Sequence, residues 1–235
     1  PGKAEALTQL GIYGACYKVS ILMTLFIQTF RYAAEPFFFS YAEKENAKKT
    51  YALVMNYFVI TCCVIFLSVM LYMDFVKYFI GEEYRSGLKV VPILLMANLC
   101  LGVFYNLAIW YKLTSKTLWG AYLALIGAGI TLLLNFILIP RMGYMGAAWA
   151  TLACYASMMV ISFFVGQRFY PVEYDLRRFF IYIVSALVIY FMSERIQLSF
   201  NLNTSWTTAI NTMFMLLFGT IIYLIEKNKS RNLAQ

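Results

Sequence analysis

Long apolar runs without a single charge constrain this chain more than any other feature. Five of them are 21 to 26 residues long, and a helix needs about 20 such residues to cross a bilayer. The strands of an outer-membrane barrel alternate in polarity, whereas these runs are continuously apolar. The sequence therefore predicts an all-α integral membrane protein.

Composition supports this class and excludes several chemistries. The chain is 62% hydrophobic and 13% charged, against about 25% charged residues in a typical soluble domain. Histidine is absent, which excludes a Ser-His-Asp or Cys-His nucleophile, a histidine metal site and an imidazole relay. The five cysteines lie inside apolar runs without CxxC spacing, so we expect no metal site, no disulfide framework and no cofactor.

The charge-free runs, together with the opening apolar segment, predict about seven transmembrane helices. The sixth is the weakest, because its 15 residues would extend only about 22 Å as a helix and would need the charged flanks to reach the interfaces. The predicted spans are Leu7–Tyr41, Thr50–Met73, Val90–Tyr111, Thr117–Pro140, Met142–Gln167, Phe179–Ser193 and Ser205–Ile225.

The distribution of basic residues predicts the orientation. With the N-terminus outside, the cytoplasmic loops hold 11 Lys and Arg residues and the outer side holds 6, which fits the positive-inside rule with a cytoplasmic C-terminus. The net charge of +8 is thus interpreted as an orientation signal and not as a nucleic-acid site. An outer N-terminus without a signal peptide leads us to expect a preceding transmembrane helix, and hence a longer protein.

Three charges interrupt the first apolar segment, Leu7–Tyr41: Lys18, Arg31 and Glu35. A charge at the centre of a spanning helix costs at least about 2.5 kcal/mol, so such residues usually face a cavity or a partner. Arg31 and Glu35 are spaced i,i+4 and either anchor the helix as a neutral pair or act in function. Lys18 has no acid within a turn, so it faces a cavity or another helix, or reaches to the interface. Pro36 predicts a kink near the pair.

Uncharged polar and small residues give weaker signals within the spans. Two stripes of small residues at i+3/i+4 spacing predict close helix packing: Gly120, Ala124, Ala128, Thr131 and Asn135, then Gly146, Ala150, Cys154 and Ser157 or Ala153. Amide side chains within spans either join helices by hydrogen bonds or line a substrate path. The candidates for lining a substrate path are Gln28, Asn56, Asn98, Asn106 and Asn135, and Asn211 is a sixth amide within a span.

Two stretches carry a family resemblance: FRYAAEPFFF, residues 30–39, and IPRMGYMGAAWAT, residues 139–151, preceded by Asn135. With the run VVPILLMANLCLGVFYNLAIWYKLTSKTLWGA, residues 90–121, they resemble the C-terminal half of Wzx-type polysaccharide flippases. These flippases belong to the multidrug/oligosaccharidyl-lipid/polysaccharide exporter superfamily. The sequence of the three stretches is most similar to members from the Bacteroidetes branch. The resemblance covers roughly Leu10 to Pro171.

The resemblance implies a C-lobe of a two-lobe transporter in the bacterial inner membrane. Residues 1–171 would form five helices of that lobe without its first helix, and residues 172–235 two further helices and a cytoplasmic tail. Its partners would be membrane lipid, the missing N-terminal half and a lipid-linked oligosaccharide on undecaprenyl pyrophosphate, moved by alternating access coupled to H+ or Na+. We expect Lys18 and Arg31 to bind the pyrophosphate, and Glu35 to balance charge or bind the coupling ion.

Other functional classes stay open at this point. A drug exporter of the MATE type shares the architecture but lacks the quoted motifs. A membrane glycan polymerase or ligase, which would be an enzyme, usually carries a large outer loop, whereas the longest loop here has about 16 residues. A seven-helix receptor would leave Lys18 unexplained. We therefore expect a transporter without covalent chemistry and without catalytic residues.

Overall fold

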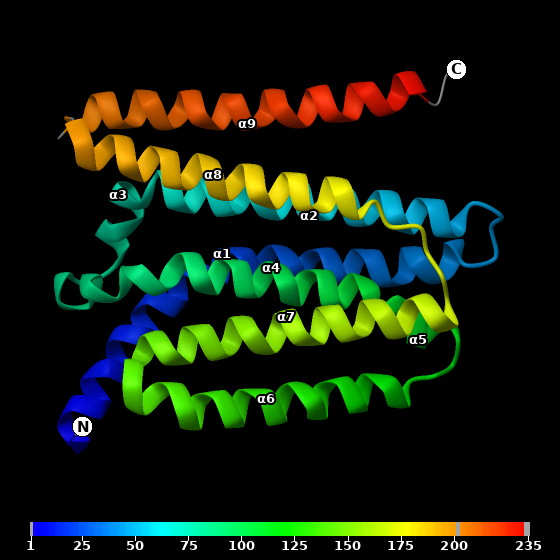
Figure 1. Ribbon diagram of the computed structural model, residues 1–235, viewed down its shortest axis with the longest axis horizontal. Helices are drawn as coiled ribbons and strands as arrows, with labels where there is room; N and C mark the ends of the chain where they lie inside the picture. The colour runs from blue at the N-terminus through cyan, green and yellow to red at the C-terminus, as the bar shows by residue number, and fades with distance from the viewer. Residues whose placement is uncertain (1, 201–202, 233–235) are drawn as a thin grey trace. The chain divides into compact units, whose positions relative to one another are not determined.

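The computed structural model describes residues 2–200 and 203–232, and within them the chain forms helices and turns without strands. Two compact units are distinguished. The first contains Pro1–Met55 and Lys77–Tyr174, and the second contains Asn56–Val76 and Asp175–Gln235. The second unit thus takes most of the second predicted span as well as the last two (Figure 1).

Seven helical segments of the described chain are long and apolar enough to cross a membrane, so the predicted fold class is confirmed. The third crossing segment joins a 3₁₀ stretch, η2, to α4 and α5. Short helical turns, α3 and η1, precede it. The bounds are α1 Lys3–Tyr41, α2 Ala47–Leu71, α3 Met73–Val76, η1 Lys77–Phe79, η2 Glu82–Val90, α4 Val91–Leu107, α5 Ile109–Leu113, α6 Leu118–Met142, α7 Tyr144–Phe169, α8 Leu176–Phe200 and α9 Thr204–Asn232.

The doubtful sixth span is longer than the charge-free run Phe179–Ser193. α8 has 25 residues and extends about 37 Å at 1.5 Å per residue, which is more than a hydrocarbon core of about 30 Å. Helix formation continues through Arg177, Arg178, Glu194 and Arg195, because charged residues at the ends of a spanning helix can extend into the interface. The chain is a multi-pass membrane protein. Its orientation stays a prediction.

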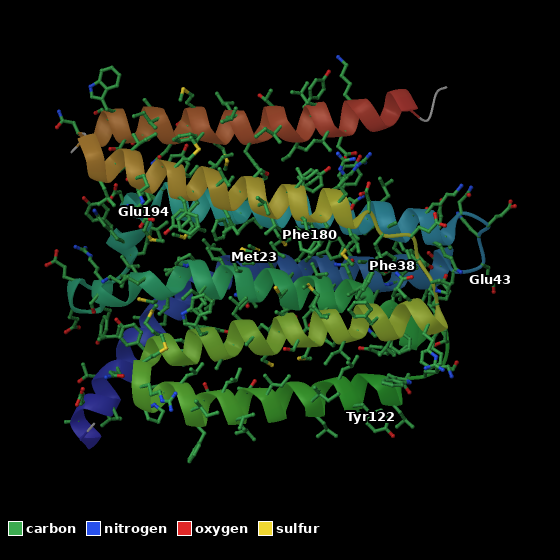
Figure 2. The ribbon with its side chains drawn as sticks, in the orientation of Figure 1. Met23, Phe38, Glu43, Tyr122, Phe180 and Glu194 are labelled. Atoms are coloured by element: carbon green, nitrogen blue, oxygen red, sulfur yellow. The ribbon has the colours of Figure 1, made fainter. Side chains whose placement is uncertain are left out.

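α4 forms the centre of the first unit. It is apolar on all sides, which is typical of a buried helix, and it packs between α1 and α7. α6 packs on the outer side of α7, as Figure 1 shows. Most of α6 is exposed, including Tyr122, labelled in Figure 2, with 52% of its surface accessible.

α1 buries one stripe of its surface against the rest of the first unit. Cys16, Met23, Ala34 and Phe38 are all less than 10% exposed and recur at helical spacing; Figure 2 labels two of them, Met23 and Phe38. The helix continues without interruption through Pro36. Pro36 therefore does not end α1, and the kink expected beside it stays a prediction. Figure 1 shows α1 bending in its N-terminal part (dark blue).

The packing of α6 on α7 corrects one of the two predicted stripes. On α7 the small residues Gly146, Ala150 and Cys154 are buried as expected. On α6 the buried residues are Leu123 and Gly127, and the Cys154 thiol donates to the Gly127 carbonyl at 3.2 Å. Ala124 and Ala128, which belong to the predicted α6 stripe, are exposed. The packed face of α6 is thus rotated by one residue, toward the position where Gly127 accommodates Met158.

Polar contacts join the apolar helices of the second unit. Asn211 of α9 accepts hydrogen bonds from Ser193 and Gln197 of α8 and donates one to the Leu71 carbonyl at the end of α2. Nearer the other end of the α8–α9 pair, the Tyr182 hydroxyl donates to the Glu226 carboxylate at 2.5 Å. These contacts matter because apolar side chains do not drive association between helices in lipid.

Candidate functional site

The three charges predicted on the first span differ in their surroundings. Lys18 is exposed, and within the described residues no acid pairs with it. Two residues earlier, the Cys16 thiol donates to the Tyr84 carbonyl of η2 at 3.4 Å, so Lys18 lies near the level of the charged segment η2. Its long side chain can therefore reach the membrane interface, which was one of the alternatives left open by the sequence.

Arg31 and Glu35 form the i,i+4 pair, with 3.7 Å between Arg31 Nε and a Glu35 carboxylate oxygen. Glu35 also pairs with Lys112 of α5. Sequence analysis assigned Lys112 to a loop and missed this contact. The three side chains are between 26% and 38% exposed and carry a combined charge of +1, so Glu35 does not cancel the cationic character of the group.

The Arg31 guanidinium lies over an aromatic ring of the adjacent helix. Its Cζ atom is 4.8 Å from the centroid of Tyr105 in α4, within the range of a cation–π interaction. The hydroxyl of Tyr111 in α5 interacts electrostatically with the Arg31 guanidinium and with the Tyr105 hydroxyl. A guanidinium has five N–H donors, and a stacked ring occupies none of them, so Arg31 retains donors for a ligand.

Further tyrosines extend from Tyr105 toward the other end of α1. Tyr13 and Tyr17 of α1 lie with their ring centroids 6.0 Å apart. Tyr155 of α7 packs with Tyr105 on one hydrophobic cluster around Cys154 and Met158, and its hydroxyl is close enough to interact electrostatically with those of Tyr13 and Tyr17. All four rings are half-buried, on three different helices. We call these four tyrosines and Arg31 the tyrosine strip.

The tyrosine strip is long enough to cover much of a bilayer. Tyr13 and Arg31 are 18 residues apart, which is five turns of α-helix or about 27 Å measured along α1, so the two side chains belong to the same face of the helix. This spacing is present in the sequence and is the signal that could have identified Tyr13 and Tyr17. Tyr105 and Tyr155 could be assigned only once α4 and α7 were known to lie beside α1.

The strip combines ring faces with hydroxyls inside an apolar region. A tyrosine presents an apolar body and one polar end that donates and accepts hydrogen bonds. Such a surface suits a ligand with both C–H faces and hydroxyls, and the guanidinium at its end suits an anion. Among the described residues no three histidine, cysteine or carboxylate side chains come together as metal ligands, and the five cysteines are free and buried.

The predicted amides are mostly inside the protein. Asn98 donates to the Ser20 carbonyl at 3.4 Å and joins α4 to α1, whereas Asn106 donates to Gly102 in its own helix. The side-chain oxygens of Asn106 and Asn135 are buried, and neither has a hydrogen-bond partner in the part of the chain that the structure describes. Asn56 is buried in the second unit, and only Gln28 is exposed. A role for any of them in lining a substrate path stays a prediction.

Comparison with known proteins adds no family to this description. No protein-family model matches the chain, and no curated protein or solved structure matches it significantly.

Proposed function

We propose that this chain is part of a flippase that moves a lipid-linked oligosaccharide across the bacterial inner membrane for surface polysaccharide synthesis. The observation that carries the proposal is the tyrosine strip, because it places hydrogen-bonding aromatic rings and an incompletely neutralised arginine along an apolar helix. The motif resemblance described above supports it. The function involves binding and movement only, without covalent chemistry.

Each part of the cargo has a matching surface. The undecaprenyl tail suits the exposed apolar faces of the helices. Sugar rings have C–H faces that pack on tyrosine rings and hydroxyls that bond to tyrosine hydroxyls. The pyrophosphate suits Arg31, whose residual charge and free donors allow charge-assisted hydrogen bonds. Lys18, about 20 Å away along α1, would meet a phosphate nearer the other leaflet.

The proposal includes a second lobe. In a two-lobe transporter the half-exposed strip would face a central cavity closed by the other lobe, and alternating access would be driven by an H+ or Na+ gradient. Glu35 is the proposed site of charge balance or ion coupling, since it contacts both Arg31 and Lys112. We do not expect these 235 residues to transport without that partner.

The proposal is tested by export in a strain whose surface polysaccharide depends on the full protein. We expect Arg31→Ala to reduce export roughly tenfold, the value of one charge-assisted hydrogen bond, with unchanged protein in the membrane. Lys18→Ala should also reduce export. Tyr105→Phe and Tyr155→Phe should reduce it less, because they retain the ring.

Arg168→Ala is the matched control, because Arg168 is an exposed arginine at the end of α7 without an ion-pair partner in the described chain. Normal export by both the Arg31 and the Lys18 variants would contradict the proposal. Equal loss in the Arg168 variant would indicate a general effect of surface charge and would also contradict it.

A further inference from the structure

A cleft of about 740 Å³ opens in the first unit between the N-terminal turns of α1 and the turn that joins α6 to α7. Its volume is in the range of small-molecule sites, about 300 to 1,000 Å³. Leu10 of α1 and Ile139 and Met142 of α6 supply apolar walls. The ends of two spanning helices meet here, so the cleft lies where lipid headgroups meet the protein.

Two opposite charges line this cleft from different helices. Glu5 comes from α1 and Arg141 from the end of α6. Both are exposed, no salt bridge joins them, and neither has another ion-pair partner among the side chains that the structure describes. A purely anionic ligand would be repelled by Glu5 and a purely cationic one by Arg141. The cleft is therefore complementary to a ligand that carries both charges.

A glycine lines the cleft at the turn between α6 and α7. Gly143 has φ +57° and ψ −137°, a backbone conformation that residues with a Cβ rarely adopt. A Cβ there would lie 3.1 Å from Cδ of Gln9 and would collide with its carboxamide oxygen. The Gln9 side chain thus rests directly on the α6–α7 turn and connects the two walls of the cleft.

We infer that this cleft binds a zwitterionic phospholipid with a primary amine, such as phosphatidylethanolamine. The ammonium group donates its N–H groups to the Glu5 carboxylate, and the phosphodiester accepts hydrogen bonds from Arg141. The glycerol and the first acyl carbons lie on Leu10, Ile139 and Met142. This inference rests on the chain being a membrane protein; the cleft shares Tyr13 with the tyrosine strip, but Glu5 and Arg141, which would bind the lipid headgroup, lie outside the strip.

The test measures lipids retained by the purified full protein in an equimolar mixture of phosphatidylethanolamine, phosphatidylglycerol and phosphatidylcholine with identical acyl chains. Native mass spectrometry should show the ethanolamine lipid retained in preference to the other two. Arg141→Gln should lower its retention roughly tenfold, and Glu5→Gln should abolish the preference over phosphatidylglycerol. Arg168→Gln and Glu173→Gln, two exposed residues outside the cleft, should leave retention unchanged.

A second variant and a second readout locate the lipid. Leu10→Trp fills the apolar wall without changing charge and should lower retention at unchanged helical content. A photoactivatable phosphatidylethanolamine should label residues 5–13 and 139–147. Labelling elsewhere, equal retention of all three lipids, or wild-type retention by both Arg141→Gln and Leu10→Trp would overturn the inference. Loss of export in the Arg31 variant has no bearing on this result.

Discussion

Replacing Asn211 by leucine tests how the second unit is held together. Asn211 is 2% exposed and makes three hydrogen bonds: from Ser193 at 2.7 Å, from Gln197 at 3.1 Å and to the Leu71 carbonyl at 2.5 Å. Interhelical hydrogen bonds in membranes contribute on average about 0.6 kcal/mol, with a maximum near 1.7. Three such bonds give about 2 kcal/mol. Leucine cannot hydrogen-bond, so the groups that bonded to Asn211 stay buried without that partner. We therefore expect the free energy of unfolding to fall by about 2 to 3 kcal/mol.

The assay is reversible unfolding in mixed micelles with increasing SDS, followed by far-UV circular dichroism. Thr220→Val is the control, since the exposed Thr220 hydroxyl bonds only to Leu216 of its own helix and its loss should change the free energy of unfolding by less than about 0.5 kcal/mol. If Asn211→Leu were as stable as the wild type, the hydrogen bonds would not stabilise the unit and the reasoning would be refuted.

Two further experiments probe the first unit. A double-mutant cycle of Glu35→Gln and Lys112→Gln should give a coupling of about 0.5 to 1 kcal/mol in the same assay, because both groups are partly exposed; zero coupling would contradict the ion pair. Gly166→Ala should destabilise by about 1 to 3 kcal/mol, because its Cβ would lie 2.7 Å from Trp110 Cδ1. Gly129→Ala, with no atom within 4 Å of the added Cβ, should not destabilise, and equal stability of the two glycine variants would contradict the close approach.

The number and positions of the helices could be predicted because the signal for a spanning helix is local. A run without charge, such as Thr117–Pro140, is sufficient to predict a helix. The bounds of α6, Leu118 and Met142, differ from the ends of this run by one and two residues. The ends were less certain because charged residues are tolerated at the interface. α8 extends beyond the run Phe179–Ser193 at both ends for this reason.

The contacts between helices could not be predicted in the way that the helices themselves could. The lipid and the protein interior are equally apolar, so both kinds of helix surface carry apolar residues. Periodicity therefore does not distinguish a packed face from a lipid-facing one in this chain. On α6 the small-residue stripe pointed to Ala124, whereas the buried residues are Leu123 and Gly127. Lys112 lies one residue beyond a predicted span, and its pairing with Glu35 depends on the placement of α5 beside α1.

The candidate site was predicted in part. Arg31 and Glu35 were identified because charges in an apolar helix are costly. The tyrosines were not, since tyrosine is common in membrane helices and at their interfaces, and a single ring carries no functional signal. Their significance comes from the convergence of Tyr105 and Tyr155 on the face of α1 that carries Arg31.

Transbilayer movement of a labelled substrate tests the central claim most directly. The full protein would be reconstituted in liposomes with a fluorescent undecaprenyl-pyrophosphate oligosaccharide, and movement would be scored by quenching of the outer leaflet with and without an ion gradient. We expect movement by the wild type, a roughly tenfold slower rate for Arg31→Ala and an unchanged rate for Arg168→Ala. A wild-type rate equal to that of protein-free liposomes, or an unchanged rate for Arg31→Ala, would contradict the account.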